Sequence, residues 1–218
     1  MIELNSVRFG YAGAPALLNV NRFAINAGER VMLRGPSGSG KSTLLNLIAG
    51  ILLPQSGSVK IGGEELSSKS DAVRRAFRIN RMGFIFQDFA LLPHLNVADN
   101  VLLPYRINPA LKLSDAVRAR MTALLAALGI VSKARAFPEK LSFGERQRAA
   151  IARAMIAEPA VVLADEPTAN LDRPNALKTI ELILQSAARN KASVVVVSHD
   201  ETLATFFDRV VEMREFNS

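Results

Sequence analysis

The residues best suited to chemistry form one glycine-rich run that matches the phosphate-loop pattern G-x-x-x-x-G-K-[ST] in full. A nucleoside triphosphate carries several negative charges, and such a loop surrounds them with backbone N–H groups. Gly35, Gly38 and Gly40 are expected to adopt backbone angles that other residues resist. The sequence therefore predicts a nucleotide-binding site formed by Gly35, Pro36, Ser37, Gly38, Ser39, Gly40, Lys41, Ser42 and Thr43.

Two side chains of this run suit phosphates and a metal ion. Lys41 places a compact cation near the β- and γ-phosphates, and the Ser42 hydroxyl can ligate Mg²⁺. The flanking segments are a strand-like run at 30–34 and apolar residues at helical spacing over 44–48, before Gly50. The order of strand, glycine-rich loop and helix sets the positive end of a helix dipole against the phosphates. It therefore favours a nucleotide-binding loop over a glycine-rich turn that binds nothing.

A pair of carboxylates at the end of a second apolar run is the next candidate. Residues 161–164 read as a buried strand that leads into Asp165 and Glu166. Ligands of parallel sheets gather at the carboxyl ends of strands, so this pair is expected beside the phosphate loop. One carboxylate can hold Mg²⁺ and the other can accept a proton from an attacking water. Acids that favour a helix N-terminus are the alternative explanation.

The elements around these residues read as an α/β protein. Short strands are expected over 1–30 and 54–66, and a helical middle follows, in which Ser114 is an N-cap and Gly129 a helix end. From about residue 158, apolar strand runs alternate with helical segments, which is typical of a parallel sheet.

Composition limits the classes that fit. The chain has 218 residues and 49% hydrophobic content, and one domain is the default for this length. No apolar run approaches the ~20 residues of a membrane span, and Met1 leads directly into a strand-like pattern rather than a signal peptide. The absence of cysteine excludes disulfides and is compatible with a cytoplasmic setting.

The chain carries a net charge of +7, which suits either nucleic acid or the anionic face of a membrane. The densest cluster of basic residues is Arg74, Arg75, Arg78 and Arg81. A solvated helix face is the favoured interpretation of this cluster.

The segment Leu141–Gln147, about twenty residues before Asp165, resembles the signature motif of ATP-binding cassette (ABC) ATPases. The other markers of that family occur in the expected order over essentially the whole chain. They are the adenine-stacking aromatic Tyr11, the Q-loop glutamine Gln87, the D-loop at 169–172 and the switch histidine His199.

The resemblance implies a P-loop NTPase fold with a RecA-like parallel sheet core, an N-terminal antiparallel β subdomain and a small helical subdomain at roughly 88–158. All of these would lie in one ABC ATPase domain, 1–218. It also implies ATP hydrolysis in a head-to-tail homodimer with two ATP molecules at its interface. Each ATP would lie between the phosphate loop of one subunit and four residues of the other, namely Ser142, Phe143, Gly144 and Glu145.

The same resemblance assigns roles in hydrolysis. Glu166 would orient and deprotonate the water, and His199 would steady the γ-phosphate. Lys41 and Mg²⁺ would neutralise the phosphate charge, with the metal held by Ser42, Gln87 and Asp165. Phe143 departs from the family pattern because it replaces the first of two signature glycines. Activity is expected to survive, with an effect on dimer closure.

The segment Phe84–Leu95 carries a large apolar load around Gln87, including Leu91 and Leu92. Core packing is one interpretation. The favoured one is a groove for a helix of a separate membrane permease, and thus a location at the cytoplasmic face of the inner or plasma membrane. This segment, with the arginines before it and Asn96–Val101 after it, resembles the ATPases of lipoprotein-releasing, macrolide-exporting and cell-division ABC systems. The end of the sequence soon after His199 favours the same subgroup.

Two other classes share this ATPase head. Nucleic-acid repair ATPases insert a coiled coil or zinc module between the phosphate loop and the strand that ends in the two carboxylates. Translation factors of this superfamily normally carry two cassettes in one chain. This chain has an ordinary helical interval and one cassette, so a transporter subunit without direct nucleic-acid contact is the favoured prediction.

Overall fold

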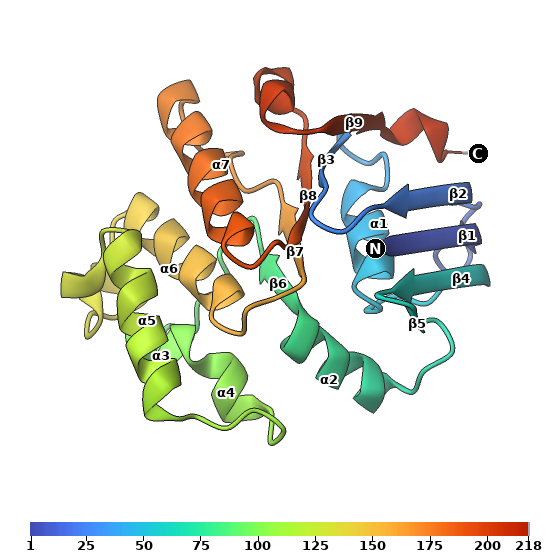
Figure 1. The fold of residues 1–218 in the computed structure, drawn as a ribbon. Helices are drawn as coiled ribbons and strands as arrows, with labels where there is room; N and C mark the ends of the chain where they lie inside the picture. The colour runs from blue at the N-terminus through green and yellow to red at the C-terminus, as the bar shows by residue number, and fades with distance from the viewer. Residues whose placement is uncertain (218) are drawn as a thin grey trace.

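A computed structural model describes residues 1–217, and Figure 1 shows two sheets with helices between and beside them. The first sheet is antiparallel, with the strand order β2-β1-β4-β5. Its strands are β1 (Ile2–Phe9), β2 (Leu18–Ile25), β4 (Ser56–Ile61) and β5 (Glu64–Glu65).

The second sheet is parallel, with the order β6-β7-β8-β3-β9. Its strands are β3 (Arg30–Arg34), β6 (Met82–Ile85), β7 (Val161–Asp165), β8 (Ser193–Ser198) and β9 (Arg209–Glu212). Because the strands run in one direction, the loop after β3 and the residues that follow β7 and β8 lie at the same edge. The α/β class and the parallel sheet are confirmed.

The central strands are buried on both faces, which explains their continuous apolar runs. In β7, Val161 and Leu163 face a core shared with helix α1 (Lys41–Ile48) and the antiparallel sheet. Val162 and Ala164 face a second core against α6 (Phe143–Met155) and α7 (Arg173–Ala188). The parallel sheet thus separates the phosphate-loop helix α1 on one face from α6 and α7 on the other (Figure 1).

The remaining helices lie mostly between β6 and β7 in the sequence. They are α2 (Asp71–Arg81), α3 (Val97–Val101), α4 (Leu103–Ile107) and α5 (Asp115–Ala127), with short 3-10 turns at Val131–Lys133, Pro138–Lys140, Glu201–Phe206 and Met213–Glu215. Ser114 caps α5 by accepting a bond from the Val117 N–H, as expected, and Gly129 follows the helix with a φ of 68°.

The expectation of a solvated arginine face on α2 is wrong for two of the four residues. Arg74 is 8% exposed and donates to the Lys69 carbonyl at 2.7 Å. Arg78 donates to the Gly50 carbonyl at 3.0 Å, so its guanidinium satisfies the end of α1, and burial lowers its pKa. These two cations therefore satisfy backbone carbonyls of their own chain, Arg74 before the start of α2 and Arg78 after the end of α1.

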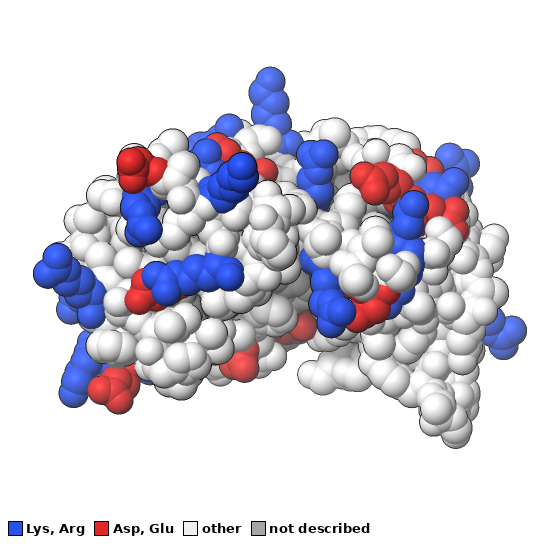
Figure 2. Space-filling view, turned by 90° about the horizontal axis from the view of Figure 1, so that it is seen from below, with Lys and Arg blue, Asp and Glu red and all other residues white. Residues whose placement is uncertain are grey.

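Figure 2 shows the face of the molecule that lies at the bottom in Figure 1, and charged residues of one sign do not cluster on it. Figure 2 shows Lys and Arg side chains spread over both halves of that face, with Asp and Glu beside many of them. A hollow lies between the two halves. This mixed distribution is unlike the one-signed stripe by which proteins track nucleic acid.

Candidate functional site

The phosphate loop connects β3 to α1 and is shaped by glycines for two different reasons. Gly38 and Gly40 have φ angles of 81° and 87°, the left-handed region that side chains rarely adopt. Gly35 lies outside that region. A Cβ there would lie 2.7 Å from the Ser39 Oγ and 2.9 Å from the Met213 Cβ. The expected backbone freedom thus applies to two glycines, and Gly35 is needed for close packing instead.

Lys41 lies at the first position of α1 and is 7% exposed. Its Nζ donates to the carbonyls of Gly35 at 2.7 Å and Pro36 at 3.0 Å, and lies 3.4 Å from a Glu166 carboxylate oxygen. The ammonium group is therefore held inside the curve of the loop, next to the backbone N–H groups at the start of the helix. This is the arrangement that binds phosphate.

Ser42 and Asp165 form the second contact between the loop and the sheet. The Ser42 hydroxyl donates to the Asp165 Oδ1 at 3.0 Å. Burial raises the pKa of Asp165, and the neighbouring negative charge of Glu166 adds to this effect, while the bond from Ser42 opposes it. Two oxygen ligands thus lie side by side beside the phosphate loop.

Glu166 follows β7 with a φ of 44°, a left-handed angle uncommon for a residue with a side chain. Its backbone N–H still donates to the Val197 carbonyl at 3.0 Å, which fixes the residue against β8. One carboxylate oxygen lies near Lys41, and the other lies 3.0 Å from the His199 Nδ1. The side chain of Glu166 is 13% exposed and that of His199 is 63% exposed. A carboxylate and an imidazole are therefore in contact at the rim of the site.

A cavity of about 370 Å³ opens over Lys41, Ser42 and Glu166, whereas His199 borders a separate hollow beside Gly35 and Pro36. Tyr11 stands at its edge, 50% exposed, and its hydroxyl lies 3.0 Å from the Thr43 Oγ1. Gln87 reaches the same cavity from the loop after β6. The residues that line the cavity are Tyr11, Leu17, Ser37, Gly38, Gly40, Lys41, Ser42, Thr43, Gln87 and Glu166.

The signature loop is not part of this cavity. Ser142 caps α6 by accepting from the Glu145 N–H at 3.3 Å, and the Glu145 carboxylate accepts from the Ser142 N–H at 2.8 Å. The bond from Ser142 lowers the pKa of Glu145, and Lys133 at 3.3 Å contributes to the same direction. Ser142, Phe143, Gly144 and Glu145 thus share one helix start, which borders a different hollow near Asn170.

Comparison with known proteins decides the family. A family model described as ABC transporter matches residues 18–169. The chain belongs to the ABC transporter family. The expected resemblance to its ATPase subunits is therefore confirmed, and the fold class with it.

Individual relatives agree with this membership. The lipoprotein-releasing system ATP-binding protein LolD of Pseudomonas fluorescens is 42% identical over 191 residues, which are 88% of this chain and 83% of that protein. The putative hemin import ATP-binding protein HrtA of Staphylococcus haemolyticus is 38% identical over 206 residues, covering 94% of this chain and 91% of HrtA.

Solved structures of the family match the whole fold. The dimeric structure of a bacterial ABC transporter cassette superposes with a TM-score of 0.86 at 35% identity, and covers 97% of this chain and 94% of its own. A dimer in a post-hydrolysis state, bound to ADP and phosphate, matches with the same TM-score at 34% identity. This ABC chain is an ATP-binding subunit with ATPase activity, and the prediction that it is an ATPase is confirmed.

No helix within the described residues is long and apolar enough to cross a membrane. The relatives and structures above are transporter subunits and cassettes, which favours transport over the nucleic-acid alternative.

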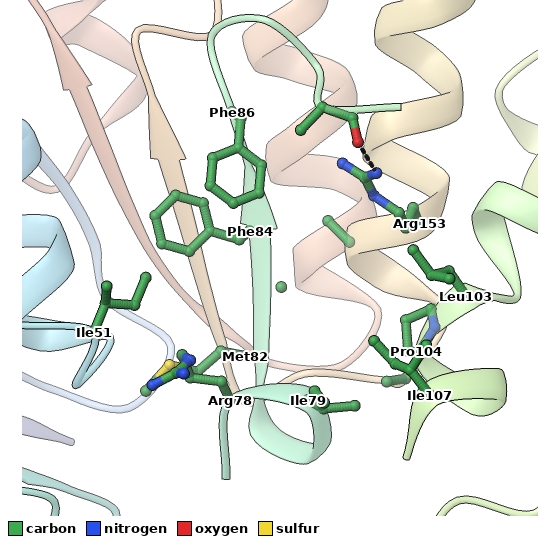
Figure 3. A pocket seen from close by; sticks show the side chains of 14 residues that line it. Ile51, Arg78, Ile79, Met82, Phe84, Phe86, Leu103, Pro104, Ile107 and Arg153 are labelled. Atoms are coloured by element: carbon green, nitrogen blue, oxygen red, sulfur yellow. Dashed lines mark hydrogen bonds between the residues drawn. The ribbon is translucent and has the colours of Figure 1, made fainter. Parts of the chain in front are cut away.

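An apolar hollow of about 330 Å³ lies between α2 and α4, along β6 and the start of the loop that follows it (Figure 3). Phe84 and Phe86 point to the same side of the chain and stack with ring centroids 4.4 Å apart. Ile51 and Ile107 line the hollow and are 45% and 59% exposed. We call this hollow the α2–α4 groove.

Leu91 and Leu92 lie outside the α2–α4 groove, although Leu91 borders a smaller hollow together with Gln87. Both leucines are half-buried, and Leu91 packs against the core of the helical layer. The backbone of Leu92 is held on both sides by the Asn100 amide, at 2.8 and 3.0 Å. The aromatic rings of the groove come from Phe84 and Phe86, which precede Gln87 in the sequence.

Sequence reasoning assigned no role to two residues that connect the parts of the site. Gln147 is buried on α6, where it donates to the Pro167 carbonyl at 2.6 Å and accepts from the Thr179 hydroxyl at 2.8 Å. Arg153, also on α6, donates to the carbonyls of Phe89 and Ala90. A polar or charged residue within the apolar, alanine-rich face of a helix was the signal that could have found them.

Proposed function

We propose that this chain hydrolyses ATP as one of two identical subunits that enclose two ATP molecules between them and drive a separate membrane permease. The observation that carries the proposal is the convergence of Lys41, Ser42, Asp165, Glu166 and His199 at one edge of the parallel sheet, beside a cavity of about 370 Å³. The dimeric cassette structures support the two-subunit arrangement.

The proposed roles follow from the contacts. Lys41 and the N–H groups at the start of α1 would bind the phosphates, and Tyr11 would stack on the adenine at the open edge. Glu166 would accept a proton from the attacking water, since its carboxylate projects to the cavity. His199 is held next to Glu166 and would contact the γ-phosphate from the rim. Lys41, Gln87, Glu166 and His199 are therefore the proposed catalytic residues.

Magnesium fits the oxygen ligands that are present. The Ser42 hydroxyl and the Asp165 carboxylate lie 3.0 Å apart, and Gln87 borders the same cavity. Mg²⁺ prefers oxygen ligands, often takes only one or two carboxylates, and completes its shell with water and substrate phosphates. When bound, it would neutralise charge on the phosphates. We propose Ser42, Gln87 and Asp165 as its protein ligands.

The second part of each ATP site would come from the partner copy. The first turn of α6 leaves backbone N–H groups without intrahelical partners, and this turn begins at Ser142. We propose that Ser142, Phe143 and Gly144 present this helix start to the γ-phosphate across the dimer interface. Glu145 would act mainly through the cap, because its carboxylate is held by Ser142 and Lys133.

We propose that the permease binds in the α2–α4 groove. The groove combines apolar area with exposed rings next to the turn that carries Gln87, so a docked helix would lie beside the nucleotide site. The chain would then sit at the cytoplasmic face of the inner or plasma membrane, held there by the permease. Similarity to LolD supports export or mechanotransmission, and the lipoprotein-releasing, macrolide-exporting and cell-division subgroup.

Co-purification from membranes tests the docking part of this proposal. The variant Ile51→Asp with Ile107→Asp places two charges on exposed positions of the groove, so the fold is expected to persist. It should lose the membrane protein that co-purifies with the unmodified chain, identified by mass spectrometry, while ATP binding is retained. Val131→Asp is a matched control, because Val131 is 46% exposed and lies outside the groove. Retained co-purification would place the permease elsewhere.

A further inference from the structure

Phe143 connects the signature loop to the turn that carries Gln87. Its ring meets the Phe89 ring edge-to-face, with centroids 4.8 Å apart and planes at 72°. Phe89 is 6% exposed and lies two residues after Gln87, in a turn closed by its N–H to the Phe86 carbonyl at 3.0 Å. A glycine at position 143 would have no side chain with which to make this contact.

The same turn is attached to α6 at a second point. Phe89 and Ala90 have φ angles of 64° and 44°, a region that side chains rarely adopt. Arg153 donates to both of their carbonyls, at 2.6 Å for Phe89. Arg153 lies ten residues after Phe143, about 15 Å along the helix axis. The turn with Gln87 is thus fixed to both ends of α6, whose N-terminus is the signature loop.

We propose that the Phe89–Phe143 ring pair transmits the position of the Gln87 turn to the signature loop of the same chain. This inference rests on the proposed function, because Gln87 would respond to ATP at its own phosphate loop. The signature loop would then present that state to the partner's ATP. Phe143 is in this account a positioning residue that couples the two nucleotide sites of a dimer.

An edge-to-face contact between two rings suits this task better than a contact between flexible side chains. An aromatic side chain has only two rotatable bonds, so a displacement of Phe89 moves its neighbour rather than being absorbed. The Arg153 clamp prevents the turn from sliding along α6 at the other end. Aromatic pairs change an equilibrium by roughly three- to tenfold, which sets the size of the expected effect.

A tryptophan reporter tests the link in the isolated chain. The chain contains no Trp, so Phe143→Trp introduces a single fluorophore that keeps an aromatic ring at this position. At a concentration where light scattering shows a monomer, Mg²⁺ and ATP should shift its emission. Adding Phe89→Leu should remove most of the shift while ATP affinity stays within about twofold. Phe137→Trp is the control, since Phe137 is 45% exposed, and its signal should not depend on Phe89.

An unchanged shift with Phe89→Leu, or no shift while ATP is bound, would overturn the proposed link. Failure of the unmodified chain to bind ATP is a separate result, measured without any substitution. It would refute the proposed function and the link that rests on it.

A double-mutant cycle gives a second test through activity. Phe89→Leu and Phe143→Leu should each raise the ATP concentration for half-maximal hydrolysis by roughly three- to tenfold. The double variant should be no worse than the larger single effect, because both remove one contact. Phe143→Tyr keeps the ring and should recover most of the loss. Effects that multiply, or that follow thermal unfolding temperatures alone, would contradict the link.

Discussion

The two sides of the proposed ATP site differ in how far one chain completes them. On the phosphate-loop side, contacts within one chain already exist at the edge of the parallel sheet. Ser42 bonds to Asp165, and Glu166 contacts both Lys41 and His199. On the signature side, the hydroxyl of Ser142 and the carboxylate of Glu145 are used within their own helix cap. That side therefore offers a surface and backbone donors rather than free side-chain groups.

On the phosphate-loop side, the chemistry of individual side chains should therefore matter most, and on the signature side the shape of the surface. The start of α1 and the ends of β7 and β8 hold the first group of side chains in fixed positions, so removing one functional group should remove one chemical step. The helix start around Gly144 has to approach a ligand held by another copy. Substitutions that add a side chain at this helix start should then lower activity more than substitutions that remove a functional group.

The largest effect is expected on the phosphate-loop side. Glu166→Gln keeps the shape of the side chain but removes the base, so ATP hydrolysis should fall by about 10²–10⁴. Binding of ATP should persist, and a dimer should accumulate with ATP and Mg²⁺, measured by light scattering. Glu64→Gln on β5 is a control for the loss of one negative charge. Hydrolysis at the unmodified rate would exclude Glu166 as the base.

On the signature side, Gly144→Ala tests shape with little other change. A Cβ there would meet only the end of the Arg148 side chain, at 3.4 Å, and the backbone angle is ordinary. Folding stability should stay the same or rise slightly, since alanine favours helix. Hydrolysis should nevertheless fall by about 10²-fold if a ligand approaches closely there. Thermal unfolding and ATPase rates are the two measurements.

Gly40→Ala completes this comparison on the phosphate-loop side. Its φ is 87° and an added Cβ would lie 2.9 Å from the Leu18 Cδ2, so stability and ATP binding should fall together. If Gly144→Ala also lowers stability, the signature glycine serves the fold of its own chain. The contrast between the two sides would then disappear.

A smaller effect is expected at the open edge of the cavity. Stacking of an aromatic ring on a base contributes roughly 1–3 kcal/mol, so Tyr11→Ala should weaken ATP binding by about tenfold or more. Tyr11→Phe is the matched control, because it loses only the contact of the hydroxyl with Thr43. Isothermal titration calorimetry distinguishes the two. Equal affinity for all three chains would show that the ring of Tyr11 does not contact the nucleotide.

The sequence was most informative where the relevant contacts are local. The strand before the phosphate loop, helix α1 and strands β7 and β8 were predictable, because each has a periodic apolar pattern next to its functional residues. The outer strands β6 and β9 were missed, since each is four residues long and its pairing depends on distant neighbours. Gly83 in β6 illustrates this, because a tertiary contact with α6 is what requires glycine at this position. A Cβ there would lie 2.4 Å from the Ala154 carbonyl oxygen.

The candidate site shows the same limit. Motif spacing indicated which side chains share the phosphate-loop side, because strand order in a parallel sheet brings their ends together. The double attachment of the Gln87 turn through Phe143 and Arg153 was not predictable. It depends on two left-handed residues and on helix packing that no local pattern encodes.

The smallest effect is expected at the opposite end of the parallel strands, away from both sides of the site. The Arg30 guanidinium and backbone N–H donate to Asp208 and hold its pKa below the usual range. Because the folded-state pKa is lowered, the pair stabilises the fold above the unfolded value near 3.9. This stabilisation is lost as the pH falls through the lower folded-state value.

Asp208→Asn should therefore lower the free energy of unfolding at pH 7 by less than about 1 kcal/mol, since both side chains are over 40% exposed and water screens them. The difference from the unmodified chain should shrink toward zero in urea titrations at progressively lower pH. Glu139→Gln is the control, since its pair with Lys140 is longer, at 3.9 Å, and more exposed. ATP hydrolysis should not change. A loss of hydrolysis in Asp208→Asn would show that the amino ends of the strands also act on the site, which would break the contrast between positioning and stability.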